Sequence, residues 1–141
     1  MQRRKAREAA LQALFQVDIG KGSVEAAVAY AVQINDLGDN AAAFCQDLVS
    51  GAIGHQGEID ATISNLAVDW SIDRLANVDR NILRIALYEL MHRQDIPESV
   101  AISEAVEIAK EYGDDNSGRF VNGILGQFAR NRKDDGDKSK E

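Results

Sequence analysis

The chain has 141 residues, of which 45% are hydrophobic and 28% are charged, with a formal net charge of −7 and a single proline. This length suits one compact domain with a sizeable core, and no apolar stretch approaches the roughly 20 residues that a membrane-spanning helix needs. Cys45 is the single cysteine, which excludes an internal disulfide and indicates a reducing, cytoplasmic location.

Apolar residues recur at three- and four-residue steps along most of the chain, which predicts helices and not strands. The first helix is expected from Arg3 to Asp18, with its end at Gly20 and Gly22. Ser23 is a suitable N-cap for the helix that follows. The other helices of the first half are expected over residues 24–34, 41–54 and 58–67.

The second half of the chain begins with a short turn at residues 72–75. The next helix, over residues 78–92, is apolar around most of its circumference, which is typical of a buried helix at the centre of a fold. Two further helices are expected over residues 98–112 and 119–129. Residues 131–141 are charged and lack apolar anchors, so we expect a disordered tail after a single all-α domain over residues 1–130.

Four cations lie within the first seven residues: Arg3, Arg4, Lys5 and Arg7. They leave 12 of the 16 basic residues against 23 acidic ones, so positive charge is concentrated at one end of an acidic chain. On a helical wheel, Arg3, Arg4 and Arg7 fall within one sector of about 100°, while Lys5 points away. Phe15 extends the same side, so we predict a helix face that binds RNA phosphates and stacks on bases.

The alternative is that this cluster is only a solvated helix start. Cations at a helix N-terminus oppose the macrodipole at a cost of a few tenths of a kcal/mol each, which favours a functional reason for them. If each of the four cations neutralised one phosphate, the logarithm of RNA affinity would fall with the logarithm of salt concentration with a slope of about −3. We therefore expect weak RNA binding that a protein partner strengthens, and Arg4→Ala or Arg7→Ala is expected to weaken it with little change in melting temperature.

A second candidate RNA-binding segment comprises Asn116, Ser117, Arg119 and Phe120, around Gly118. Backbone N–H groups at a helix start bind anions, Arg119 adds a charge, and an aromatic ring stacks on a base. The alternative is that Phe120 belongs to the core and Gly118 to a turn, and composition alone favours this alternative.

The remaining polar residues give no sign of catalysis. Glu89 lies among apolar neighbours, which favours a structural ion pair over a catalytic carboxylate. His55 and His92 are far apart in the sequence and have no second ligand at metal-binding spacing, so no metal site is expected. Neither a nucleophile motif nor a cofactor-binding fingerprint is present, so we expect neither an enzyme nor a cofactor.

Four strings of the sequence, taken together and in order, resemble the NusB family of bacterial transcription antitermination factors. They lie at residues 3–15, 78–90, 100–105 and 117–125. The resemblance runs from about residue 3 to 129, and the combination is far more specific than any one amphipathic helix.

The resemblance implies an all-helical fold of about seven helices in two small packed bundles, over about residues 1–68 and 69–130. It also implies binding to the boxA element of nascent RNA together with NusE, a small-subunit ribosomal protein. The heterodimer would join RNA polymerase in a complex that suppresses termination, notably on ribosomal RNA operons.

Particular residues of this chain match the family's functional positions. Arg3, Arg4, Lys5 and Arg7 match its arginine-rich RNA motif, and Asn116, Ser117, Arg119 and Phe120 match its second RNA-facing stretch. Phe15 and Asp79 match positions of the NusE interface, so Phe15 is expected either to stack on RNA or to contact NusE.

Two hypotheses remain open at this stage. The first is an RNA-binding antitermination factor that acts with NusE. The second is a protein-interaction module whose acidic helical surface docks a basic partner without direct RNA contact. The resemblance also leaves a monomer and a homodimer as alternatives.

Overall fold

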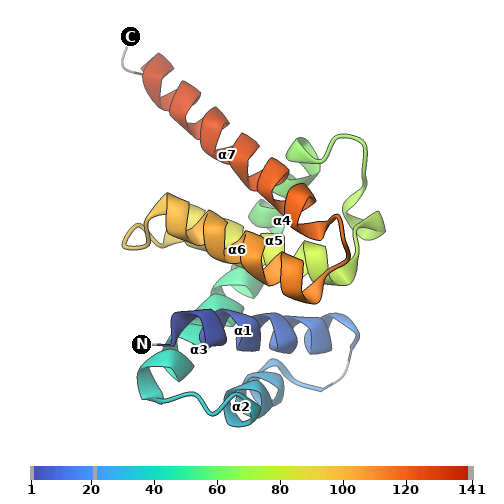
Figure 1. Ribbon diagram of the computed structural model, residues 1–141, viewed down its shortest axis with the longest axis vertical. Helices are drawn as coiled ribbons and strands as arrows, with labels where there is room; N and C mark the ends of the chain where they lie inside the picture. Colours follow the sequence, from blue (N-terminus) through green and yellow to red (C-terminus); the bar gives the residue numbers. More distant parts are fainter. Residues whose placement is uncertain (1, 21, 140–141) are drawn as a thin grey trace.

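The computed structural model describes residues 2–20 and 22–139, with side chains through Asp134. These residues form seven α-helices and one 3-10 turn (Figure 1). The elements are α1 (Arg3–Asp18), α2 (Val24–Ile34), α3 (Asp39–Gly54), α4 (Gln56–Leu66), η1 (Ile72–Arg74), α5 (Asn77–His92), α6 (Glu98–Tyr112) and α7 (Ser117–Ser139). The all-α prediction is confirmed, and the predicted bounds of the first two helices agree with the structure.

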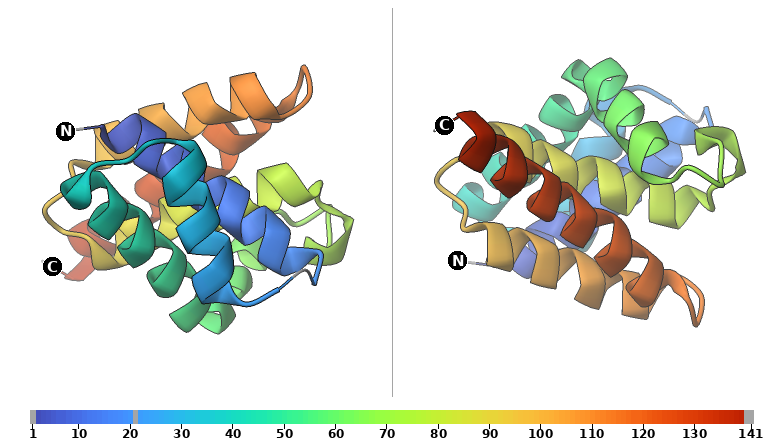
Figure 2. Two further views of the ribbon diagram at one scale, coloured as in Figure 1. Left: turned by 90° about the horizontal axis from the view of Figure 1, so that it is seen from below. Right: turned by 90° about the horizontal axis from the view of Figure 1, so that it is seen from above.

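α5 is the centre of the fold, as its apolar circumference predicts. Every residue from Asn81 to Leu90 is buried, and α5 packs against α1, α3, α4, α6 and α7. Figure 2 shows the first three helices on one side of α5 and the last two on the other. Because α5 contacts helices of both halves of the chain, the division into bundles over residues 1–68 and 69–130 stays a prediction.

Two glycines and a serine N-cap form the connection between α1 and α2. Gly20 and Gly22 have φ values of +76° and +81°, a left-handed conformation that glycine adopts without a steric penalty. The Ser23 hydroxyl then accepts a hydrogen bond from the Ala26 N–H at 3.1 Å, so Ser23 is the N-cap that the sequence predicted.

α7 is longer than the sequence indicated. It begins at Ser117 and runs to Ser139, so residues 131–139 are helical and not disordered as expected; residues 140–141 lie outside the described residues. The Arg132 guanidinium donates to the Leu90 carbonyl at 2.6 Å, pairs with Glu98 and lies over the Phe128 ring. These contacts hold the helix beyond its last apolar anchor, which periodicity could not show.

A network of polar side chains ties the end of α1 to the start of α5. The Asp18 carboxylate accepts hydrogen bonds from Asn77 at 3.1 Å, Arg80 at 2.9 Å and Asn81 at 3.1 Å, and it pairs with Arg84 at 3.5 Å. Burial acts to raise the pKa of Asp18, but these hydrogen bonds and charges outweigh it and lower the pKa below its ordinary value.

We expect Asp18→Asn to lower the free energy of unfolding at pH 7 by about 2 kcal/mol, because hydrogen bonds to a charged group are lost. A depressed carboxyl pKa contributes stability above the unfolded-state value, about 3.9 for aspartate, and that contribution is lost as the pH falls through the folded-state pKa. Urea denaturation at several pH values should therefore show a difference in the free energy of unfolding between variant and parent that becomes smaller below about pH 4. A gap that persists unchanged to pH 2 would contradict this, and Asp73→Asn, at an exposed aspartate of η1, is the control.

Candidate nucleic-acid interface

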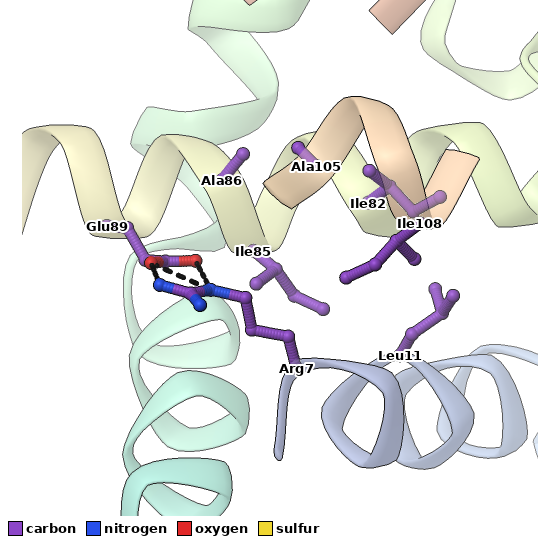
Figure 3. A pocket seen from close by; sticks show the side chains of 8 residues that line it. All are labelled: Arg7, Leu11, Ile82, Ile85, Ala86, Glu89, Ala105 and Ile108. Atoms are coloured by element: carbon purple, nitrogen blue, oxygen red, sulfur yellow. Dashed lines mark hydrogen bonds and ion pairs between the residues drawn. The ribbon is translucent and has the colours of Figure 1, made fainter. Parts of the chain in front are cut away.

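The amino-terminal cations do not form the single exposed sector that the helical wheel predicted. Arg7 is 3% exposed and lies inside the fold. Its Nε donates to both carboxylate oxygens of Glu89, at 3.1 and 3.0 Å, and its Nη2 donates to Oε1 at 2.6 Å (Figure 3). Glu89 is 1% exposed, so the predicted structural ion pair of Glu89 is confirmed. The prediction that Arg7 presents its charge on the surface is wrong.

The Arg7–Glu89 pair lies beside a small apolar cavity between α1, α5 and α6 (Figure 3). Its volume is about 10 Å³, which is at most one water molecule. Burial acts to raise the pKa of Glu89, and the hydrogen bonds and charge of Arg7 oppose that rise. Arg7 and Glu89 therefore neutralise each other inside the fold, and neither charge is directed at an external ligand.

Arg4 and Lys5 remain on the surface. Arg4 pairs with Glu104 of α6, with 43% of the Arg4 side chain exposed, and Lys5 is exposed. Exposed ion pairs contribute only about 0–1 kcal/mol, so a phosphate group can displace Glu104 from Arg4 at little cost.

Arg3 gathers with two other guanidinium groups around the ring of Phe44, which sequence reasoning had placed only in the core. The Cζ atoms of Arg3, Arg7 and Arg93 lie 4.6, 5.2 and 5.3 Å from the ring centroid. Arg93 follows the end of α5, so its place beside the amino terminus has no signal in the sequence. The hydrogen bonds between Arg93 and Asp95 lower the pKa of Asp95 to about 2.

The second candidate segment forms the junction between α6 and α7. The Asp114 carboxylate accepts the Asn116 N–H at 2.8 Å, and the Ser117 hydroxyl accepts the Asp114 N–H at 2.9 Å. An acidic side chain thus occupies the helix start where the sequence suggested an anion site. Ser117 is only 1% exposed, so its predicted contact with RNA would require rearrangement of this junction.

The other residues of this segment divide between surface and core. Asn116 and Arg119 are exposed, whereas Phe120 is half-buried and packs against the core. Arg119 lines an open groove of about 510 Å³ together with Lys110 of α6, a cation that sequence reasoning did not single out. Asp114 and Asp115 line the same groove, and Lys110 pairs with Glu107 at 3.4 Å, so the groove carries charges of both signs.

Phe15 and Asp79, the predicted partner-binding residues, differ in accessibility. Phe15 is 40% exposed on α1, whereas Asp79 is 9% exposed in the first turn of α5. Burial raises the pKa of Asp79, and the nearby Ser117 hydroxyl opposes the rise. Asp79 Oδ1 has no hydrogen-bond partner within the described residues. The role of both residues in partner binding stays a prediction, with Phe15 the more accessible of the two.

The helices of the described part of the chain include none that is both long enough and apolar enough to cross a membrane.

Comparison with known proteins places this geometry in a family. The model of the NusB family matches residues 4–130. The transcription antitermination protein NusB of Bacillus velezensis is 48% identical over 125 residues, which are 89% of this chain and 93% of that protein. The NusB of Heliobacterium modesticaldum is 47% identical over 130 residues, which are 92% of this chain but 63% of that protein.

Solved structures agree with this assignment. T. maritima NusB superposes with a TM-score of 0.85 at 40% identity, and the match covers 92% of each chain. A chain in a crystal structure of the antitermination factors NusB and NusE in complex with dsRNA superposes with a TM-score of 0.81 at 30% identity. That match covers 90% of this chain and 96% of the other.

Proposed function

Since the chain belongs to the NusB family, we propose that it is a transcription antitermination factor that binds boxA RNA of nascent transcripts as a heterodimer with NusE. The heterodimer joins RNA polymerase in the complex that suppresses termination, notably on ribosomal RNA operons. The observation that carries the proposal is the family match over residues 4–130, which includes both ends of the candidate interface. The proposed role is non-enzymatic and cytoplasmic.

The cations of the proposed RNA contact are those that the fold leaves accessible. Arg4 and Lys5 lie at one end of the interface, and Arg119 lies at the other. Arg3 lies beside the amino-terminal pair, against the Phe44 ring. Arg7 acts as a positioning residue, because its pairing with Glu89 fixes α1 against α5.

Burial of Arg7 reduces the electrostatic contribution of the amino terminus. Three cations in place of four at the amino terminus would contribute about −2 to the salt slope of RNA binding. Such a shallow slope indicates low RNA affinity for the chain alone, particularly on a molecule of net charge −7. We therefore propose that NusE completes the RNA-binding surface, with Phe15 as the exposed apolar contact for it.

The double substitution Arg4→Ala/Lys5→Ala is expected to weaken binding of a boxA oligoribonucleotide to the heterodimer about tenfold or more, because two phosphate contacts are lost. The salt slope should become shallower by about 1.4 at the same time, because each lost phosphate contact removes about 0.7 from its magnitude. Fluorescence anisotropy with labelled RNA at several salt concentrations, with and without NusE, measures both effects. Circular dichroism is expected to show unchanged melting, since both side chains are on the surface.

Arg74→Ala removes an exposed cation from η1, outside both candidate RNA-binding segments, and is the matched control that should leave RNA affinity unchanged. If the double substitution leaves the RNA affinity of the heterodimer unchanged, the result would favour the protein-interaction module, in which NusE alone contacts RNA. A heterodimer that fails to bind boxA RNA at all would contradict the proposed function itself.

A further inference from the structure

Three potential metal ligands that are distant in the sequence meet where the end of α5 reaches the junction of α3 and α4. His55 stands between α3 and α4, Glu58 lies in the first turn of α4, and His92 is the last residue of α5. The two imidazole rings, which sequence spacing had left isolated, stack with their centroids 3.8 Å apart and an interplanar angle of 20°. From this cluster we propose that the chain has a binding site for a divalent transition-metal ion of the zinc class.

The ligand atoms already have nearly the separations that a metal would impose. Glu58 Oε2 lies 3.3 Å from His92 Nε2 and 3.7 Å from His55 Nδ1, and all three ligand atoms lie within 4.8 Å of one another. Metal–ligand bonds of about 2.1 Å in tetrahedral geometry place ligand atoms about 3.4 Å apart. Rotation of these exposed side chains closes the site if the two stacked rings tilt until each nitrogen lone pair points at the ion in its own ring plane.

The donor set selects the class of ion. Two imidazole nitrogens and one carboxylate oxygen are the ligands of open zinc sites, whereas magnesium and calcium take oxygen ligands. Neutral imidazole is the form that binds a metal. The side chains of His55, Glu58 and His92 are 42%, 50% and 29% exposed, which leaves water to fill the remaining positions.

The backbone holds these ligands in place. The His55 N–H donates to the Gly51 carbonyl at 3.0 Å, and the His55 carbonyl accepts the Ile59 N–H at 2.9 Å, so one residue is fixed by two helices. The Tyr88 ring stacks at 6.0 Å from His55 and 5.8 Å from His92. A site held by helices and packed rings loses little conformational entropy when the ion binds.

Calorimetric titration of the untagged full chain with zinc chloride tests the proposal. One zinc ion per chain is expected, and magnesium chloride should give no binding heat. His92→Asn and Glu58→Gln should each weaken zinc binding tenfold or more, whereas Glu107→Gln, at an exposed glutamate of α6, should leave it unchanged. A stoichiometry of half a zinc ion per chain would overturn the proposed site. Unchanged zinc affinity in the His92→Asn variant would overturn it as well.

The composition of the chain allows a second measurement that needs no variant. His55 and His92 are the two histidines of the sequence, so an NMR spectrum of the imidazole groups contains two sets of signals. Both sets should shift together and reach saturation at one equivalent of zinc. A shift of one ring alone would show a single-histidine contact and contradict the proposal. This result is independent of RNA binding and of the proposed function.

Discussion

Glu89→Ala is expected to lower the free energy of unfolding by about 3–5 kcal/mol, the largest effect of any single substitution considered for this chain. Without Glu89, the Arg7 guanidinium would remain 3% exposed with none of its three hydrogen bonds to that carboxylate. The fold must then either bury an unpaired charge or open α1 from α5 to hydrate it. Urea denaturation followed by circular dichroism measures the loss.

Two further variants separate this explanation from a general sensitivity of α1. Glu104→Ala removes the partner of the exposed Arg4 and should change the free energy of unfolding by less than about 1 kcal/mol. The double substitution Arg7→Met/Glu89→Leu replaces both charges with apolar groups of similar size, and it should recover most of the loss. If Glu89→Ala is no more destabilising than Glu104→Ala, the pair does not hold α1 in place.

The same pair changes how an Arg7 variant must be interpreted. The sequence led us to expect weaker RNA binding by Arg7→Ala with little change in melting temperature. The structure corrects this, because Arg7→Ala leaves Glu89 as a buried carboxylate without its cation. A loss of RNA binding in the Arg7 variant would therefore reflect a loss of structure. Arg4→Ala instead tests the RNA contact of an accessible cation.

Periodicity predicted the helices because each helix buries one face and exposes the other. It also identified α5 as central, since a helix that is apolar all round has no face to present to water. Periodicity does not identify the partner of a polar side chain. Arg7 and Glu89 are 82 residues apart, and the wheel placed Arg7 beside Arg3 and Arg4 because all three share one side of α1.

A signal for this pair was nevertheless present in the sequence. Arg7 lies three, four and seven residues before Ala10, Leu11 and Leu14, so it shares one side of α1 with apolar residues. Glu89 likewise lies among apolar neighbours. Two opposite charges in apolar surroundings require each other, because neither is stable there alone. The contact between His55 and His92 had no such signal, since only the crossing of α5 with the α3–α4 junction creates it.

Gly51→Ala is expected to destabilise the fold by about 2 kcal/mol. An added Cβ would lie 2.1 Å from Tyr88 Cζ, well inside van der Waals contact. Tyr88 cannot move away freely, because it is 7% exposed and its hydroxyl donates to Asp47 at 2.9 Å. The intrinsic helix preference of alanine, about 1 kcal/mol over glycine, offsets only part of this cost.

Gly54→Ala in the same helix is the matched control, because nothing lies within 4 Å of its added Cβ. Its expected effect is neutral or slightly stabilising, so the Gly51 substitution alone should lower the urea midpoint. Displacement of the Tyr88 ring should also disturb the stacked histidines and weaken zinc binding in the Gly51 variant alone. Equal stability of the two variants would mean that α3 and α5 separate without loss, and that the close packing of Tyr88 on Gly51 does not hold the histidine rings in place.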